Sequence, residues 1–208
     1  MAGFRLLGLA NEPAITPKFE YKIAKAIADD LIQILQPSCE IINIAGSIRR
    51  QKALVKDIEI VCVPKKIFFQ TELFGKGIDL VIPAFRKAIE TVAEKTLKGN
   101  LEGRYMQIQL KNNIVLDLFL PQLNDYYRQY AIRTGSGDYS KNMIATGWRK
   151  KGWCGTNDGL RREKDCYKSD ATWKCYNPNP ELPPVWQSEE EFFDWLGIKW
   201  INPSERNA

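Results

Sequence analysis

Gly46-Ser47-Ile48-Arg49-Arg50 lies between two apolar segments, 39–45 and 57–63, and the second segment begins with Asp57-Ile58-Glu59. Both segments have the composition of β-strands. Glycine lets a backbone approach a phosphate closely, and the serine hydroxyl and the arginines add a donor and positive charge. The chain contains neither GxxxxGKS nor GxxxxGKT, so this is not a Walker loop. A Gly-Ser pair alone is typical of a plain turn, but this order of strand, turn, arginines and acidic strand predicts a phosphate site beside carboxylates.

Three acidic residues lie inside segments that are otherwise apolar. Asp57 and Glu59 are two positions apart on one predicted strand, so their side chains share a face. Asp117 lies within a second apolar segment, 114–120. A salt bridge or a place at a strand end would account for any one of them, because an unpaired buried carboxylate is costly. The three together favour a shared site for a divalent metal, and carboxylate oxygens select Mg²⁺ or Mn²⁺.

The composition excludes several kinds of chemistry. The chain has 208 residues, which suits one domain or two small ones. It has no histidine, which rules out Ser-His-Asp and Cys-His catalysis, HExxH zinc sites and imidazole acid–base work. The formal net charge is +5, and residues 133–164 carry the whole excess. Such a basic stripe favours a polyanionic partner.

The remaining composition is that of an ordinary globular protein. No apolar run is long enough to span a membrane, and the N-terminal apolar stretch breaks at Asn11-Glu12-Pro13, too early for a signal peptide. We therefore expect no membrane partner and a cytoplasmic location. The five cysteines include no CxxC pair, which argues against a disulfide framework and fits a reducing compartment. A zinc site at Cys154, Cys166 and Cys175 is a minor alternative.

Hydrophobic periodicity and chain breakers predict an α+β fold. Helices are expected at 18–35 (started by Thr16 and Pro17), 83–97, 125–132, 139–150 (capped by Asp138) and from the Ser188 capping box to 196. Strands are expected at 39–45, 57–63, 105–110 and 113–120, whereas 65–82 is ambiguous and 151–185 reads as short strands and loops. The pattern changes after Pro121, which predicts one unit at 1–121 and a second at 122–208.

The first motif resembles the signature of family X DNA polymerases, which belong to the polymerase-β-like nucleotidyltransferase superfamily. Leu116-Asp117-Leu118 is similar to the segment that carries the third catalytic aspartate of that family. The stretch Arg133-Thr134-Gly135-Ser136-Gly137-Asp138-Tyr139-Ser140-Lys141-Asn142-Met143 resembles the thumb segment that contacts the incoming nucleotide. Residues 190–206 resemble the family's C-terminal end. The resemblance covers roughly residues 17–206 and is greatest to compact phage or viral members, whose location would be the host cytoplasm.

The resemblance implies an α+β fold with a nucleotidyltransferase palm at 1–121, a mixed β-sheet with helices on one face, followed by a small α+β thumb at 122–208. It also implies two-metal phosphoryl transfer. Nothing in the sequence suggests an obligate oligomer, so we expect a monomer. Asp57, Glu59 and Asp117 would be catalytic and would hold two Mg²⁺ or Mn²⁺ ions. The dNTP would contact Gly46, Ser47 and Arg50 through its phosphates (with Lys56 a weaker candidate) and Thr134, Gly135, Ser136 and Ser140 through its sugar and base. DNA phosphates would contact Lys141, Arg149, Lys150 and Lys151.

The chain departs from the family pattern in four places. Glu59 stands where aspartate is usual, so the metal geometry differs by a methylene. Val115 and Ile144 stand where relatives often carry arginines. Only about sixteen residues precede the expected palm, which argues against a lyase domain and against helix-hairpin-helix fingers.

Three functions from different classes are therefore open. The first is a template-directed DNA polymerase that fills gaps during repair. The second is a template-independent nucleotidyltransferase that acts on a nucleic-acid end or another acceptor. The third is a non-catalytic module that binds DNA or a partner, which the retention of all three carboxylates disfavours.

Overall fold

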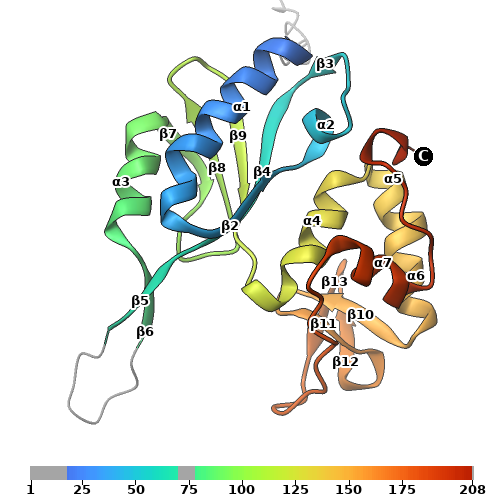
Figure 1. Cartoon of the computed structure of the whole chain (residues 1–208). Coiled ribbons are helices and arrows are strands. Elements are labelled where there is room, and N and C mark those ends of the chain that lie inside the picture. The colour runs from blue at the N-terminus through green and yellow to red at the C-terminus, as the bar shows by residue number, and fades with distance from the viewer. Residues whose placement is uncertain (1–17, 70–77, 208) are drawn as a thin grey trace, which may run out of the picture.

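The computed structural model describes residues 18–69 and 78–207, and its largest sheet is a five-stranded mixed β-sheet (Figure 1). The strand order is β2 (Cys39–Ile44), β4 (Asp57–Pro64), β9 (Val115–Phe119), β8 (Tyr105–Leu110) and β7 (Ala93–Gly99). β4 and β9 are parallel, and the other neighbours are antiparallel. The four strands expected from the sequence are confirmed, and β7 is an additional edge strand.

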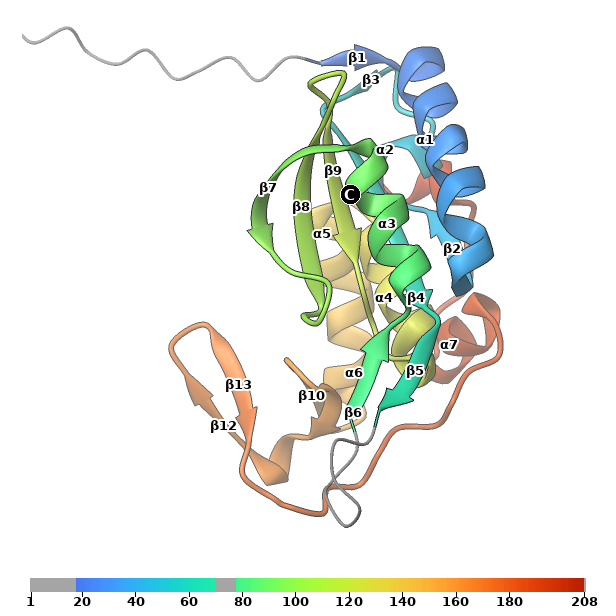
Figure 2. The same cartoon turned by 90° about the vertical axis from the view of Figure 1, so that its left-hand side faces the viewer.

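One face of this sheet packs against α1 (Tyr21–Leu35) and α3 (Pro83–Val92), as Figures 1 and 2 show. Both helices are amphipathic, and their apolar stripes meet the alternate apolar residues of the central strands. The buried residues of this core include Ala24, Ala28, Leu31 and Leu35 of α1, Phe85 and Ile89 of α3, and Ile58, Ile60, Leu116 and Leu118 of the sheet. This face corresponds to the expected arrangement of helices on a mixed sheet.

The opposite face of the sheet is divided into a polar part and an apolar part. Asp57 and Glu59 lie where β4 begins, and Val61 and Val63 follow on the same face. Val61 and Val63 pack with Tyr126 of α4 (Tyr126–Thr134) in a separate apolar cluster. The expectation of helices on one face only was therefore incomplete, because the apolar half of the second face is buried under α4.

The C-terminal region combines short helices with a four-stranded sheet. After η2 (Leu123–Asp125) and α4, the chain forms α5 (Gly137–Tyr139), a π-helical segment η3 (Ser140–Ala145) and α6 (Thr146–Lys150). The sheet has the order β11 (Gly159–Arg162), β10 (Trp153–Thr156), β13 (Thr172–Cys175) and β12 (Cys166–Ser169), with η4 (Glu163–Asp165) before β12. The last elements are α7 (Glu189–Leu196) and η5 (Pro203–Glu205).

Aromatic side chains form the core of this region. Trp148, Trp153 and Trp186 are buried with Phe192 and Phe193. The Trp186 ring contacts Phe192 edge-on with their centroids 4.8 Å apart. Most of the tryptophans therefore pack in a core, as we expect for a small domain. None of the helices in the described residues is both long enough and apolar enough to cross a membrane.

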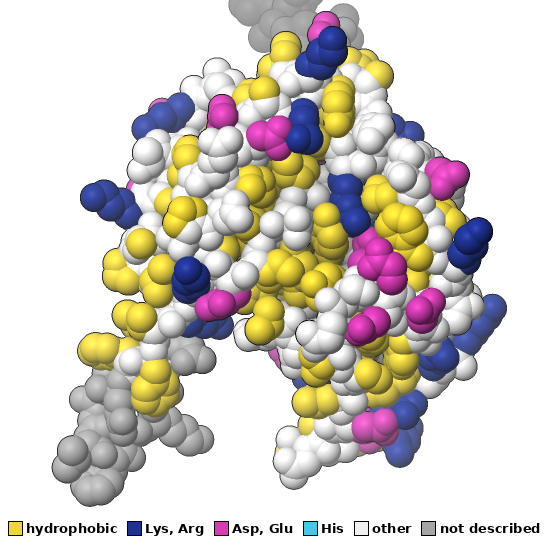
Figure 3. Space-filling view, in the orientation of Figure 1, with side chains coloured by type: hydrophobic (Ala, Val, Ile, Leu, Met, Phe, Trp, Pro, Cys, Tyr) yellow, Lys and Arg dark blue, Asp and Glu magenta, His cyan; other side chains and the backbone are white. Residues whose placement is uncertain are grey.

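A β-hairpin projects from the five-stranded sheet, where the sequence was ambiguous. It pairs β5 (Lys66–Phe69) with β6 (Ile78–Val81). The hairpin presents hydrophobic side chains to solvent, as Figure 3 shows, and Phe68 is 68% exposed.

Two expected helices have different limits in the structure. The helix expected at 83–97 ends at Val92, and 93–99 instead forms β7. The reason is tertiary, because residues 93–99 pair with β8, and the local pattern does not show that partner. The helix expected at 18–35 begins at Tyr21, because Phe19–Glu20 (β1) pairs with Leu54–Val55 (β3). It continues into η1 (Gln36–Ser38), and the expected start at Thr16 and Pro17 lies outside the described residues.

The expected helix caps are only partly as predicted. Ser136, not Asp138, caps the helical segment that starts at Gly137, because its Oγ accepts a hydrogen bond from the Tyr139 amide. Ser188 caps α7 by accepting from the Glu191 amide at 3.1 Å. The Glu191 carboxylate accepts from the Gln187 amide instead of completing a capping box at Ser188. The helix expected at 125–132 corresponds to α4, which begins one residue later and ends two residues later.

Candidate active site

The three carboxylates lie on one face of the five-stranded sheet. Glu59 of β4 is the direct neighbour of Asp117 in β9, and Asp57 is the neighbour of Val115. Because parallel strands in register present opposite residues to the same side, all three acidic side chains share a face. Glu59 and Asp117 line a cleft of about 620 Å³, the two residues being partly buried. The parallel pairing of β4 with β9 therefore places the three carboxylates on one face, as the sequence predicts.

Burial and mutual repulsion both act on the carboxylates of this cluster. Burial, and then the charges of Asp57 and Asp117, raise the pKa of Glu59 to about 7. Burial and the charge of Asp117 also raise the pKa of Asp57. Nearby like charges and low solvation both disfavour the ionised form of a carboxyl group. A bound cation would relieve this repulsion.

Asp117 is held by two side chains from the adjoining strand. The Tyr105 hydroxyl donates to Asp117 Oδ1 at 2.6 Å, and Gln107 Nε2 donates to the same oxygen at 2.8 Å. The Tyr105 ring lies 5.3 Å from that of Phe119, centroid to centroid. Sequence reasoning did not select these two residues. Their alternation along the strand, on the same face as the carboxylate, was the available signal.

Arg133 belongs to the helical part of the cleft wall, and its charge acts on Glu59. Its guanidinium carbon lies 4.0 Å from the centre of the Phe119 ring, and Arg133 lines the same cleft as Glu59. Its Nε is buried and has no hydrogen-bond partner among the described residues. Burial lowers the pKa of Arg133, and the charge of Glu59 opposes that shift. The sequence analysis placed Arg133 in the thumb-like motif but did not choose it as a site residue.

The Gly-Ser turn approaches the acidic strand closely. Gly46 opens α2 (Gly46–Arg49) with a φ of +61°, in the left-handed region that favours glycine. A methyl group at Gly46 would lie 1.8 Å from Glu59 Oε2, so that carboxylate packs directly on the glycine. The Oγ of Ser47 and the Nε of Arg50 are buried without a hydrogen-bond partner among the described residues. The turn thus keeps two buried donors beside the carboxylates.

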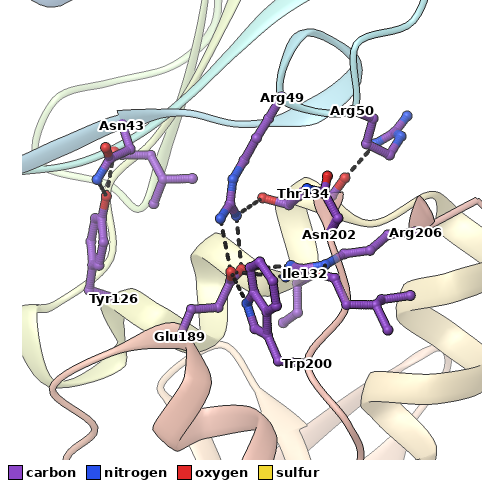
Figure 4. A network of polar contacts seen from close by, with 12 residues as sticks. Asn43, Arg49, Arg50, Tyr126, Ile132, Thr134, Glu189, Trp200, Asn202 and Arg206 are labelled. Carbon is purple, nitrogen blue, oxygen red and sulfur yellow. Dashed lines mark hydrogen bonds and ion pairs between the residues drawn. The ribbon is translucent and has the colours of Figure 1, made fainter. Parts of the chain in front are cut away.

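The two arginines after the turn connect it to the C-terminal region. Arg50 Nη1 donates to the backbone oxygen of Thr134 at 2.6 Å. Arg49 donates to Thr134 Oγ1 at 2.6 Å and to both carboxylate oxygens of Glu189 at 2.8 Å (Figure 4). The Arg49 guanidinium also lies 3.8 Å from the centre of the Tyr130 ring. The expectation that Arg49 adds charge to a phosphate site is therefore not supported by its contacts, which fix it to the opposite region.

Glu189 is the centre of this polar network. Arg206 donates to its two carboxylate oxygens at 2.7 and 3.0 Å, and Trp200 Nε1 donates at 2.9 Å (Figure 4). Burial alone would raise the pKa of Glu189, but the hydrogen bonds from Arg49 and Arg206 lower it to about 2. The network fastens the Gly-Ser turn to α7. Sequence reasoning missed it, because partners that bond directly are separated by up to 140 residues.

The residues that we expect to line the nucleotide lie at the junction between α4 and α5, where they make local contacts. The Thr134 side chain is fully buried and accepts from Arg49. A methyl group on Gly135 would lie 2.7 Å from a Tyr139 ring carbon, so this position has no space for a side chain. Ser140 Oγ donates to the Ile132 backbone oxygen at 2.8 Å. The Ser136 hydroxyl serves as the cap described above, and its amide donates to the Arg206 backbone oxygen at 3.0 Å.

The remaining predicted contacts lie on the surface of the C-terminal region. Lys141, Arg149, Lys150 and Lys151 are all exposed, and Lys151 lies 5.8 Å from the centre of the Trp195 ring. A DNA-contacting role for these residues stays a prediction. The cleft also includes residues that sequence reasoning did not select, namely Arg104, Arg128, Gln129, Thr156 and Asn157.

The sequence of the C-terminal region, with its short helices, small sheet and capped helix, matches a known family model. Residues 130–207 match the family model of the DNA polymerase beta thumb. We call these residues the thumb segment. The match supports a relationship to polymerase-β-like enzymes, as the sequence motifs suggest, while the resemblance of the preceding residues stays a prediction. A comparison with curated proteins found no similar sequence.

The three carboxylates on this face of the sheet, two of which line the cleft, suit a hard divalent cation. Three carboxylates offer only oxygen ligands, which Mg²⁺ and Mn²⁺ prefer. Within the described residues, however, no three acidic or cysteine side chains converge into a ready-made ion site. The Glu59 carboxylate packs on Gly46, and Asp117 Oδ1 is occupied by Tyr105 and Gln107.

Proposed function

We propose that the protein is a DNA-directed DNA polymerase of the polymerase β type that adds a deoxynucleotide to a primer 3′-hydroxyl and fills gaps during DNA repair. The observation that carries the proposal is the place of Glu59 and Asp117, on adjoining strands of a cleft that is also lined by the thumb segment. Residues 18–121 would serve as a catalytic palm. A carboxylate cluster in a cleft beside a DNA polymerase thumb fits metal-assisted phosphoryl transfer better than hydrolysis or redox chemistry.

Asp57, Glu59 and Asp117 would hold two Mg²⁺ ions, which when bound neutralise phosphoryl charge and favour ionisation of the attacking hydroxyl. Tyr105 and Gln107 both donate to Asp117 Oδ1 and so hold this carboxylate in place. Fixing a reactive group in advance lowers the reorganisation that the transition state requires. No histidine is needed for these roles, because charge and position replace an imidazole.

The triphosphate of the incoming dNTP would occupy the Gly-Ser turn. Ser47 Oγ and Arg50 Nε are buried donors without a partner among the described residues, and an anion is the complement that such donors favour. Gly46 allows close approach because it has no side chain. Arg133 would contribute positive charge on the other side of the cleft.

Thr134, Ser136 and Ser140 would act on the nucleotide mainly by shaping the backbone between α4 and α5, because their hydroxyl groups make local hydrogen bonds. Gly135 would act in the same way, because its position has no space for a side chain. This refines the expectation that they line the sugar and base directly.

A primer-extension assay tests the proposal. A primer–template, a gapped duplex and a single strand are each offered with single dNTPs and Mg²⁺ or Mn²⁺. Insertion of the complementary nucleotide on paired substrates supports a template-directed polymerase. Untemplated tailing would indicate a terminal transferase. Absence of product would favour a non-catalytic binding module.

Two variants complete the assay. Asp117→Asn removes a proposed metal ligand while it keeps the size of the side chain, so incorporation should be lost and DNA binding retained. Asp30→Asn, at an exposed carboxylate of α1 on the helix-covered face of the sheet, is the matched control and should remain active. An active Asp117→Asn variant would contradict the assignment of the metal site.

A further inference from the structure

Three cysteines that the proposed reaction does not use lie together on the small sheet of the thumb segment. Cys154 is in β10, Cys166 begins β12 and Cys175 ends β13. Cys166 and Cys175 are direct register partners across the antiparallel β12–β13 pair. Burial, then hydrogen bonding and charge interaction with the other two thiols, raise the pKa of Cys166 to about 12. Cys166 therefore interacts with each of the other two thiols.

The hairpin geometry defines how Cys166 and Cys175 face each other. A two-residue turn at Asp170 and Ala171 joins the strands, and Asp170 has a φ of +53°, as such turns require. The hydrogen bond that closes the turn makes the pair of residues next to it a hydrogen-bonded pair. The following pairs along the hairpin then alternate between non-hydrogen-bonded and hydrogen-bonded. The fourth pair, Cys166 with Cys175, is therefore non-hydrogen-bonded, and the next amide, that of Tyr176, is bonded again at 3.0 Å to the Asp165 oxygen.

That kind of pair brings two cysteines within disulfide distance. Opposite residues of a non-hydrogen-bonded pair have Cα atoms about 4.5 Å apart. Disulfides span Cα separations of about 4.4 to 6.8 Å, so no strand has to move for a bond to form. Cys166 and Cys175 are both half-buried, whereas Cys154 is 1% exposed. A small oxidant can thus reach the cross-strand pair more easily than the third thiol.

We propose that Cys166 and Cys175 form a cross-strand disulfide by exchange with a small-molecule disulfide such as oxidised glutathione. One thiolate attacks the glutathione disulfide and releases one glutathione; the second thiolate then displaces the other glutathione as the protein disulfide forms. The two thiol hydrogens end on the two released glutathiones. The bond fastens the β12–β13 hairpin beside β10, which contributes Gly155 and Thr156 to the cleft. The proposal does not depend on polymerase activity.

The full-length protein provides a direct test, because trypsin separates the three cysteines. Cleavage sites at Lys151, Arg161, Lys164, Lys168 and Lys174 place each cysteine on its own peptide. The protein is equilibrated at mildly alkaline pH in glutathione buffers of increasing oxidised fraction, alkylated, digested and analysed by mass spectrometry. We expect a linked peptide pair that contains Cys166 and Cys175, with a mass about 2 Da below the sum of the free peptides.

Variants separate the pair from its neighbour. Cys154→Ser should keep the Cys166–Cys175 link, and Cys175→Ser should lose it. The thiols of Cys39 and Cys62, buried in the other core, should stay alkylatable only after unfolding. A Cys154–Cys166 link, or a wild-type protein that stays fully reduced in excess oxidised glutathione, would overturn the proposal. The wild-type peptide map decides the question even if Cys175→Ser does not fold.

A thermal measurement gives a second readout. The oxidised wild-type protein should unfold at a higher Tm than the reduced protein, because the cross-link restricts the unfolded chain. Cys154→Ser should show the same redox-dependent shift in Tm. A shift that survives in Cys175→Ser would contradict the assignment.

Discussion

The Tyr105 hydroxyl donates a 2.6 Å hydrogen bond to Asp117 Oδ1 from the neighbouring strand of the same sheet. Because the acceptor is the third proposed metal ligand, this contact connects a residue outside the recognisable motifs to the proposed chemistry. Tyr105→Phe removes the donor and leaves the ring that contacts Phe119. A hydrogen bond to a charged group contributes about 1.5–3 kcal/mol. We expect kcat to fall by roughly 10- to 100-fold with little change in KM for dNTP, measured by steady-state primer extension.

The readout that isolates a positioning role is the Mg²⁺ concentration at half-maximal rate, which should rise in Tyr105→Phe. Tyr167→Phe, at a tyrosine that is 51% exposed, is the matched control and should behave as wild type. Equal loss of activity at all Mg²⁺ concentrations and a lower Tm would indicate that Tyr105 is needed only for folding.

Gly46→Ala should disturb the proposed site strongly, although it adds only one methyl group. The added methyl group would lie 1.8 Å from Glu59 Oε2, on a backbone with a φ of +61°. The left-handed conformation alone costs a residue with a Cβ about 1–2 kcal/mol, and Glu59 must also move. We expect lower stability in urea denaturation and loss of nucleotide incorporation. Gly137→Ala is the control for stability, because its methyl group meets no described atom within 4 Å.

Glu189→Gln should destabilise the protein strongly. The substitution leaves Arg206, which is fully buried, and Arg49 without a neutralising charge. Removal of one partner from a buried ion pair costs about 3–5 kcal/mol. Urea denaturation should show a correspondingly lower free energy of unfolding. Glu181→Gln breaks the exposed ion pair with Arg162 and should leave stability unchanged; an equal effect of both variants would contradict the special role of Glu189.

The same carboxylate predicts sensitivity to acid. The pKa of Glu189 is about 2 in the folded protein, against an ordinary value of 4.5. A depressed folded-state pKa gives stability that is fully present above the unfolded pKa and is lost as the pH falls through the folded one. Unfolding midpoints should therefore decrease as the pH falls from about 4.5 toward 2. The decrease should be smaller in Glu189→Gln, and identical pH profiles would exclude Glu189 as the cause.

The exposed basic residues predict salt-dependent DNA binding. If Arg149 and Lys150 each contact a phosphate, the plot of log affinity against log salt concentration should become shallower by about 1 for each residue changed to glutamine. Lys98→Gln, at an exposed lysine on β7, is the control and should leave the slope unchanged. Fluorescence anisotropy with a labelled gapped duplex measures the slope. An unchanged slope in the double variant would place the DNA grip elsewhere.

Local pattern was sufficient to predict most strands and the grouping of the carboxylates. Alternation placed Asp57 and Glu59 on one face, and parallel pairing of β4 with β9 added Asp117. The strand at 93–99 could not be predicted locally, because its residues fit a helical pattern until β8 offers them backbone partners. Tertiary pairing overrode propensity there.

The parts of the candidate site that sequence reasoning missed depend on contacts between distant segments. Arg49 looked like a phosphate ligand, since nothing near it in the sequence indicates Glu189 as its partner. Tyr105 and Gln107 carry no motif of their own, and only the strand order shows that they reach Asp117. Thr134 and Ser140 were assigned to the nucleotide by resemblance, whereas the structure shows what their hydroxyl groups already bind.

The ion pair between Arg49 and Glu189 also sets an order of events during synthesis. Its two members are 140 residues apart, so a ribosome that adds about 5–20 residues per second needs on the order of ten seconds to supply the second after the first. During that interval the Gly-Ser turn has emerged without the carboxylate that later holds it. A nascent chain that stops before α7 would therefore carry all three acidic residues of the cleft but an unfastened turn.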